Sequence, residues 1–479
     1  MTSEQKQKIF SFLQDQIVNA DFRVKAYVFD EKGKRMFHRN AYVRLAMHLQ
    51  NFIAKKSNIR WLIMYGLRGA GKTTLLAQLY EQTKIENKRK LFLSVDQALG
   101  IFGVSLKEIL EVYEEILGGS FEQLTEPVFL FLDEVQYDEK WGLLLKTIYD
   151  RTNKIFIVAT GSSALSLQAS TDVVRRAVFE KLYPMSFTEF IKIKKQKTEL
   201  KGLSQLLREV LFNSADAKSV FEGLKNLEVK TRQYWIDLSS QEIDQYMKFG
   251  TLPFMLALNN EALVYDQIKK TLERVVSVDI PHITQFSADT VSKIPMVLYA
   301  IAETEQLSLN SMAKNMEISR PIITSILETL ERTETIWRVY PHGSHMSQVR
   351  QASKYLFTSP AFRAMYFNFI GNTRLQDNYK GKLFEDTVGL YFNRLFSGKP
   401  DSSITYDGAL GGADFIVRDG KKTFVIEVGT GEKSFKQVET TMRKKGVNAK
   451  YGILISRSPL AVDEAKNIVS VPISYFLLM

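Results

Sequence analysis

The chain of 479 residues is long enough for about three domains of roughly 150 residues each, and its 45% hydrophobic and 24% charged residues are typical of globular proteins. No apolar run approaches the roughly 20 residues that a membrane span needs, and the absence of cysteine excludes disulfides and thiolate metal sites, so we expect a cytoplasmic protein with no membrane partner. The net charge of +11 is compatible with an acidic partner such as nucleic acid, and equally with a surface that is generally rich in lysine.

The first part of the chain is expected to be an α/β domain. Residues 1–55 are predicted to be mostly helical, with a short hairpin-like stretch at residues 26–34. Beyond residue 59 short apolar strands alternate with helices, which predicts a parallel sheet covered on both faces. The expected strands are Trp61–Tyr65, Leu91–Val95, Val128–Leu132, Ile155–Ala159 and a fifth near Phe179–Tyr183.

A phosphate-binding loop is predicted at residues 66–73, because the sequence Gly-Leu-Arg-Gly-Ala-Gly-Lys-Thr fits G-x-x-x-x-G-K-[ST] between a strand and a helix. Its glycines let the backbone wrap closely around phosphate oxygens, and the N-terminus of the following helix stabilises negative charge. Lys72 should reach the β- and γ-phosphates, and the Thr73 hydroxyl should bind Mg²⁺. The loop therefore predicts ATP and Mg²⁺ as ligands. The residues expected to bind the nucleotide are Gly66, Leu67, Arg68, Gly69, Ala70, Gly71, Lys72, Thr73 and Thr74.

The second half of the predicted site is the apolar strand 128–132, which ends in Asp133 and Glu134. This pattern places Asp133 near the Mg²⁺ ion and Glu134 where it can polarise an attacking water molecule. The next strand ends in Thr-Gly-Ser-Ser at residues 160–163. A polar side chain there either contacts the γ-phosphate or the water, or caps a helix through Ser162 or Ser163.

The middle of the chain is expected to be helical over residues 185–290 and then to form three short helices and a hairpin over residues 291–345. Residues 308–316 and 319–332 fit two helices joined by a turn, with wing strands near 335–340 and 355–358. Arg320 and Thr324 lie near the start of the second helix, where a winged helix contacts the major groove. That helix is poor in lysine and arginine, so the module is compatible with either DNA or a protein partner. A second α/β unit is predicted from about residue 379, with a helix at 382–396 and strands at 404–406, 414–417, 424–428 and 452–455.

Together these features resemble a large family of bacterial and archaeal AAA+-like ATPases related to the signal-transducing STAND branch. The segments that carry the resemblance are residues 66–73, Leu132–Gln136, 160–163, Leu182–Phe190, Tyr246–Pro253, Asp279–Pro281 and Gly381–Glu385. The resemblance implies an α/β P-loop NTPase core with a parallel sheet, a helical lid, a winged helix and a C-terminal restriction-endonuclease-like α/β domain. The expected boundaries are 1–40 for an N-terminal extension, 41–190 for the core, 191–290 for the lid, 291–365 for the winged helix and 366–479 for the C-terminal domain.

The resemblance also suggests an arginine that stabilises the phosphoryl transition state. The family often carries Gly-Arg before the Pro-x-Ser-Phe segment, where this chain has Arg175 and Arg176. Arg176 is the closer match by position. It is expected to act either in its own subunit or across the interface of a homo-oligomer.

In the C-terminal domain, Glu385, Asp414 and Glu427 follow the order of carboxylates in PD-(D/E)xK nucleases, in which two acids hold Mg²⁺. The lysine that normally follows the last acid is replaced by Gly429, so the three acids form a candidate degenerate nuclease site. The fold is compatible either with cleavage or with packing and binding alone. The residues that would substitute for the lysine are Lys433, Lys436 and, on the adjoining helix, Gln437.

The leading functional expectation is an ATPase that uses nucleotide turnover as a conformational switch and is associated with DNA, with Glu134, Lys72 and Arg176 as catalytic residues. One alternative is a metal-dependent nuclease gated by ATP. Another is a switch that does not hydrolyse its nucleotide and recruits a protein partner.

Overall fold

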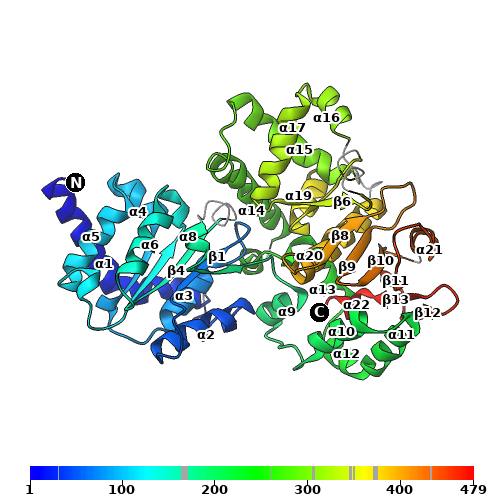
Figure 1. Cartoon of the computed structure of the whole chain (residues 1–479), viewed down its shortest axis with the longest axis horizontal. Helices are drawn as coiled ribbons and strands as arrows, with labels where there is room; N and C mark the ends of the chain where they lie inside the picture. The colour runs from blue at the N-terminus through cyan, green and yellow to red at the C-terminus, as the bar shows by residue number, and fades with distance from the viewer. Residues whose placement is uncertain are drawn as a thin grey trace. The chain divides into compact units, whose positions relative to one another are not determined.

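The computed structural model describes residues 1–30, 32–162, 171–258, 260–304, 308–344, 348, 351–370, 376–431 and 434–479. The chain divides into two compact units, Met1–Tyr183 and Pro184–Met479, each of which has its own sheet (Figure 1). Within these described ranges no helix combines the length and the apolar character that crossing a membrane requires.

The N-terminal unit is built on a five-stranded sheet with the strand order β2-β3-β4-β1-β5, and all of its neighbouring strands are parallel. Of the three inner strands, β3 and β4 are completely buried, as expected for strands covered on both faces. The predicted parallel sheet is therefore confirmed, although β5 ends two residues earlier than expected and Val95 opens a helix rather than closing β2. The strands are β1 (Trp61–Tyr65), β2 (Lys90–Ser94), β3 (Val128–Asp133), β4 (Ile155–Gly161) and β5 (Val178–Lys181).

Helices cover both faces of this sheet, because successive strand residues point to opposite sides. Leu62 and Met64 of β1 pack in one cluster with α2 and α3, whereas Trp61 and Ile63 pack in another with α4, α5 and α6. The long helix α1 contributes to both clusters. The helices are α1 (Ser3–Val28), α2 (Ala41–Ile53), α3 (Lys72–Gln82), α4 (Val95–Phe102), α5 (Leu106–Leu117), α6 (Trp141–Arg151) and α8 (Thr171–Val174).

The expected hairpin-like stretch at residues 26–34 is wrong over its first half. Helix α1 continues to Val28, and only a single bridge between Phe29 and Arg35 follows it. The reason is that Val24 and Val28, one helical turn apart, extend the buried stripe of α1.

The second unit is built on a mixed sheet of eight strands in the order β12-β13-β11-β10-β9-β8-β6-β7. Its inner strands β10 and β11 are parallel, β9 runs antiparallel to β10, and helix α20 packs beside them (Figure 1). Asp414 lies directly before β9 rather than on it, and β12 and β13 add strands that the sequence pattern did not reveal. The strands are β6 (Ile336–Pro341), β7 (Lys354–Phe357), β8 (Ser402–Tyr406), β9 (Phe415–Asp419), β10 (Lys422–Val428), β11 (Tyr451–Ser456), β12 (Ala461–Asp463) and β13 (Ile468–Pro472).

The helices over residues 187–245, which fall mostly within the segment predicted as a lid, share their core with this C-terminal sheet. Phe212 packs edge-on against Phe396 and Phe424, and the Tyr451 hydroxyl donates to the Leu211 carbonyl at 2.7 Å. Figure 1 shows α11 beside β13. The helices are α9 (Phe187–Lys195), α10 (Leu203–Asn213), α11 (Ala217–Asn226), α12 (Glu228–Trp235) and α13 (Ser240–Gln245).

Along the chain, the helices over residues 187–245 are followed by further α-helices and then by the β6–β7 hairpin. These α-helices are α14 (Glu261–Arg274), α15 (Ala288–Glu303), α16 (Leu309–Met316) and α17 (Arg320–Arg332). The order of helices and strands agrees with the one predicted for a winged helix, while the assignment itself stays a prediction. The hairpin is not isolated, because β6 also pairs with β8 of the C-terminal sheet at Tyr340 and Pro341. After β7, α19 (Pro360–Ile370) and α20 (Gln376–Phe396) lead back into that sheet.

Candidate functional site

The loop at residues 66–73 connects β1 to α3 and has the backbone conformation that its glycines allow. Gly66, Gly69 and Gly71 have φ angles of 148°, 84° and 94°, which residues with a side chain rarely adopt. A Cβ atom on Gly66 would lie 2.4 Å from the Leu182 carbonyl oxygen, so this position has no space for any side chain. Lys72 is buried at the start of α3, and its ammonium group donates to the carbonyl of Gly66 at 3.0 Å. The left-handed glycines and the buried Lys72 are the features expected of a loop that wraps around phosphate oxygens.

Next to the loop, a carboxylate is held between two hydroxyl groups. The Thr73 hydroxyl donates to one oxygen of Asp133 at 2.8 Å, and the Thr160 hydroxyl donates to the other. Thr160 also accepts the backbone N–H of Glu134 at 3.2 Å. Asp133 ends β3 and Thr160 lies near the end of β4, so neighbouring strands bring these groups together at the carboxyl edge of the sheet.

Asp133 lies in a strongly desolvated environment. Burial and the nearby charge of Glu134 raise the pKa of Asp133 to about 6, while Thr160, Thr73 and Lys72 partly offset that rise. A buried carboxylate beside a threonine hydroxyl is the type of oxygen pair that binds a hard cation. These two residues therefore fit Mg²⁺, whose positive charge would stabilise the ionised form of Asp133.

Glu134 follows Asp133 in the left-handed region of the backbone, with a φ of 55°. Such a φ is uncommon for a residue with a side chain and is concentrated at functional sites. Gln136 donates a hydrogen bond to the Glu134 carboxylate. The Thr160 hydroxyl thus fixes the backbone of Glu134 and Gln136 holds its side chain, next to the loop that the sequence predicts to bind phosphate.

Of the residues predicted at the end of β4, Ser162 is buried and Ser163 lies outside the described residues. The residue of this segment that contacts the predicted site is Thr160, whose hydroxyl is hydrogen-bonded to Asp133.

Arg176 lies away from the loop. Its guanidinium forms a two-pronged ion pair with Asp150 at 2.8 and 3.0 Å and also donates to the Asp172 carbonyl. Arg176 precedes the amino end of β5, whereas the loop follows the carboxyl end of the parallel strand β1. The expectation that Arg176 acts on the nucleotide of its own subunit is therefore not met, because the two lie at opposite edges of the sheet. Arg175 precedes β5 in the same way and is exposed to solvent.

Sequence reasoning missed Arg39, which is buried beside the loop just before α2. Its Nη1 donates to the Ala70 carbonyl at 2.7 Å and its Nη2 to the Tyr183 carbonyl at 2.9 Å. These partners are 31 and 144 positions away along the chain, and no local pattern distinguishes Arg39 from a surface arginine.

In the second unit the three predicted carboxylates meet at one end of the sheet. The backbone N–H of Asp414 donates to Glu427 at 3.3 Å, and the N–H of Val428 donates to Asp414 at 3.0 Å. Glu385 of α20 joins them through a residue that the sequence did not suggest, Lys354 of β7. The Lys354 ammonium forms ion pairs with Glu385 and, at 3.1 Å, with Asp414.

Lys354, Glu385 and Glu427 of this carboxylate–lysine cluster are almost completely buried, and the side chain of Asp414 is partly exposed. Burial raises the pKa of Glu385 and opposes ionisation of Lys354, but the two carboxylates beside Lys354 raise its pKa overall and keep it charged. Across the described ranges no group of three or more histidine or acidic side chains is placed to hold a metal ion. Among the suggested substitutes for the missing lysine, Lys433 lies outside the described residues, Lys436 opens α21 (Lys436–Met442), and Gln437 donates to the Gly412 carbonyl at 3.4 Å.

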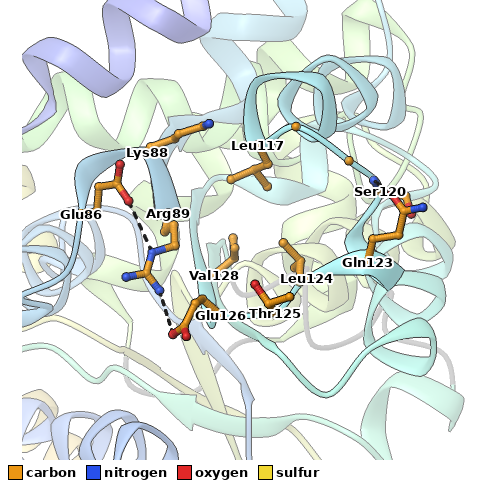
Figure 2. Close-up of a pocket in the computed structure, with 12 residues that line it drawn as sticks. Glu86, Lys88, Arg89, Leu117, Ser120, Gln123, Leu124, Thr125, Glu126 and Val128 are labelled. Atoms are coloured by element: carbon orange, nitrogen blue, oxygen red, sulfur yellow. Dashed lines mark hydrogen bonds and ion pairs between the residues drawn. The ribbon is translucent and has the colours of Figure 1, made fainter.

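A separate pocket of about 370 Å³ lies at the amino ends of β2 and β3 (Figure 2). Arg89 crosses one side of it, with ion pairs to Glu86 at 3.7 Å and to Glu126 at 3.4 Å. The phosphate loop follows the carboxyl end of β1, so this pocket lies at the opposite edge of the same parallel sheet and is not part of the nucleotide site.

Comparisons with known proteins agree with this geometry. Residues 58–191 match the family model described as an AAA domain. Together with the parallel sheet and the phosphate loop, this match identifies residues 58–191 as an AAA-type P-loop domain.

The whole chain has a relative of similar length. This chain is 36% identical over 426 residues to the uncharacterized protein MJ1637 of Methanocaldococcus jannaschii, and the alignment covers 87% of this chain and 84% of that protein. The chain therefore belongs to the same family as MJ1637. A second protein of that organism, MJ1544, is 21% identical over 56% of this chain and 53% of its own length. Among solved structures, AMPPCP-bound DnaA from Aquifex aeolicus is 15% identical over 64% of this chain and 92% of its own, at a TM-score of 0.28. A variant of RuvB from Thermotoga maritima is 13% identical over 64% of this chain and 90% of its own, also at a TM-score of 0.28.

Proposed function

We propose that the N-terminal unit binds ATP with Mg²⁺ and hydrolyses it, and that turnover acts as a conformational switch. The observation that carries this proposal is the network of Thr73, Asp133 and Thr160 beside the phosphate loop. This network links Thr73 and Asp133, the residues expected to hold a metal ion, to the backbone of Glu134, the residue expected to activate water.

In this proposal the loop N–H groups and Lys72 bind the phosphates. Thr73 and Asp133 hold Mg²⁺, which neutralises phosphate charge when it is bound. Glu134 orients the attacking water and accepts its proton, while Thr160 holds the backbone on which Glu134 is carried. Because Arg176 lies at the opposite edge of its own sheet, the proposed role for it is to reach a nucleotide in a neighbouring copy of a homo-oligomer.

The test is phosphate release from ATP with Mg²⁺, compared between the wild type, Glu134→Gln and Lys72→Ala. Glu134→Gln keeps the size and hydrogen bonding of the side chain but removes its basicity, so ATP binding should persist while turnover falls by about 10²–10⁴-fold. Lys72→Ala should lose binding itself. Unchanged turnover in Glu134→Gln would rule out the role of Glu134. A wild type that binds ATP tightly without releasing phosphate would instead support the switch that does not hydrolyse its nucleotide.

Association with DNA is the finer part of the proposal, and it is supported by the start of α17. Ser319 and Arg320 are exposed there, while Ile323, Ile326 and Leu327 face the core. This arrangement presents the N-terminal turn of a second helix to solvent, as a major-groove reader does. Phosphate release measured with and without duplex DNA tests it, with Arg320→Ala as the comparison. Stimulation by DNA that is lost in Arg320→Ala supports DNA contact, whereas no stimulation favours a protein partner.

The second candidate function is a metal-dependent nuclease, and the convergence of Glu385, Asp414 and Glu427 around Lys354 favours it. Lys354 supplies a lysine beside the acids, whereas Gly429 occupies the position two residues after the last acid where such nucleases have their lysine. DNA nicking with Mg²⁺ or Mn²⁺ that disappears in Asp414→Ala and Glu427→Ala would establish it. No cleavage of duplex or single-stranded DNA would leave the cluster with a role in packing or binding.

A further inference from the structure

The phosphate loop is connected to the end of the N-terminal unit by three separate contacts. The N–H of Leu182 donates to the Tyr65 carbonyl at 2.7 Å, directly before the loop. The Leu182 carbonyl fills the space where a Cβ atom of Gly66 would lie. Tyr183 is the last residue of the unit, and Arg39 holds its carbonyl and the carbonyl of the loop residue Ala70 at the same time.

Arg39 is suited to this double contact. It is 6% exposed, and its planar guanidinium presents several N–H donors in a fixed arrangement. A lysine would place one rotatable ammonium group in the same space and lacks the rigid fork that spans the two carbonyls. The two carbonyls that Arg39 joins are therefore kept at a fixed separation by one side chain.

The contact at Ala70 also orients a group that binds phosphate. A trans peptide is planar, with its C=O and N–H pointing in opposite directions. When Arg39 binds the Ala70 carbonyl, it fixes the N–H of Gly71 on the other side of that peptide. Gly71 is the N-cap of α3, where free N–H groups bind anions. Arg39 thus positions a phosphate-binding N–H from behind the loop.

We propose that Arg39 is a positioning residue that couples phosphate binding in the loop at 66–73 to the backbone at Leu182–Tyr183, from which the chain continues into the second unit. When a bound phosphate restricts the motion of the loop, Arg39, which is hydrogen-bonded to both carbonyls, also restricts the motion of the backbone at Tyr183. This inference rests on the proposed ATP site, and it names the route by which nucleotide binding reaches the rest of the chain.

The experiment measures two quantities on the full chain, namely ATP affinity by calorimetry with Mg²⁺ and hydrogen exchange of the peptide that spans residues 178–187, with and without ATP. The Leu182 N–H is the reporter, because it is hydrogen-bonded to Tyr65. In the wild type, ATP should slow its exchange on the order of tenfold. In Arg39→Met, ATP should bind about tenfold more weakly, the factor for one lost hydrogen bond from a charged donor, and at saturating ATP the protection should be absent.

Two further variants distinguish coupling from general damage. Arg39→Lys keeps the charge in the same place and should bind ATP within about threefold of the wild type, yet lose most of the protection. Arg44→Met is the matched control, since Arg44 joins α2 to Glu180 on β5 near the same segment, and it should behave as the wild type.

The outcomes separate the two proposals. A wild type that does not bind ATP contradicts the proposed function. A wild type that binds ATP without changing exchange at Leu182 contradicts the coupling alone. Wild-type protection in both Arg39→Met and Arg39→Lys would also overturn it, as would loss of protection in Arg44→Met to the same extent.

Discussion

Replacing Thr160 by valine tests the network beside the phosphate loop most directly. Thr160 is completely buried, donates to Asp133 and accepts the N–H of Glu134. Valine has nearly the same shape, so the substitution leaves no cavity and removes only the two hydrogen bonds. The loss of a bond to a charged carboxylate costs about 2 kcal/mol, and an unpaired buried N–H costs about 1 kcal/mol more. The substitution is therefore expected to lower the stability of the N-terminal sheet by about 3 kcal/mol and to leave the stability of the second unit unchanged.

Native-state hydrogen exchange of the amides in β3 and β4 measures this cost locally. At pH 8, where Asp133 with its pKa of about 6 is ionised, a loss of about 3 kcal/mol corresponds to exchange that is on the order of 100-fold faster. Thr160→Ser is the matched control, since it keeps the hydroxyl and loses only a methyl group.

The same variant separates two roles for Thr160. If its hydroxyl acts through Asp133 and Glu134, Thr160→Val should bind ATP within about threefold of the wild type but release phosphate on the order of tenfold more slowly. Equal exchange rates in the valine and serine variants, or a loss of ATP binding larger than the loss of turnover, would refute this reasoning and favour direct contact with the γ-phosphate.

Three further substitutions have expected outcomes that follow from burial. Gly66→Ala places a Cβ atom 2.4 Å from the Leu182 carbonyl and should abolish ATP binding in calorimetry. Arg363→Met leaves the buried carboxylate of Asp386 without its partner and should destabilise the second unit by about 3–5 kcal/mol in urea denaturation. Lys354→Met leaves the buried carboxylate of Glu385 without its ion-pair partner. Because the pKa of Glu385, which burial already raises to about 7, then rises further, the destabilisation should be small at pH 5, where Glu385 is protonated, and should grow as the pH rises to 8.

Two of these three substitutions have a control variant in the same chain, and Lys354→Met is compared with itself at two pH values. Gly100 lies within α4 with open space where its Cβ would be, so Gly100→Ala should bind ATP normally. Arg232 forms an exposed ion pair with Glu228 on one helix, so Arg232→Met should change stability by less than about 1 kcal/mol. A Gly66→Ala protein that binds ATP as Gly100→Ala does, or an Arg363→Met protein as stable as Arg232→Met, would contradict the reasoning from burial. A Lys354→Met protein equally destabilised at pH 5 and pH 8 would show that packing, not charge, accounts for the effect.

The candidate nucleotide site could be outlined from the sequence because its parts are local. The glycines of the loop, Lys72 and Thr73 lie within eight consecutive residues, and Asp133 and Glu134 follow one apolar run. The alternation of apolar strands and helices was sufficient for the parallel sheet. What the pattern could not supply is which groups face one another. It suggested that a polar residue at the end of β4 contacts phosphate or water, whereas the Thr160 hydroxyl is bound to Asp133.

Arg39 and Lys354 were missed for a single physical reason. Each makes its decisive contacts with residues at least 31 positions away, and each lies in a sequence that gives no sign of burial. The helices over residues 187–245 show the same limit at a larger scale. Their apolar stripes indicate that one face is buried, but not that the face packs on strands formed more than two hundred residues later, as the contact between Tyr451 and Leu211 shows.

The strand order explains how a switch at the phosphate can reach the exit from the N-terminal unit. The acids end β3, Thr160 lies near the end of β4, the loop follows β1, and Leu182 follows β5. These four strands are neighbours in that order, and all of them end at the same edge of the sheet because they are parallel. The strand on one side of β1 therefore carries Thr160, which contacts the Asp133 carboxylate and the Glu134 backbone. The strand on the other side is followed by Leu182 and Tyr183, the last residues of the unit. In the proposed function, hydrolysis changes the charge at the loop, and Arg39 contacts both the loop residue Ala70 and Tyr183 at the end of the unit. The arrangement therefore needs no distant element to connect turnover with a change in the second unit.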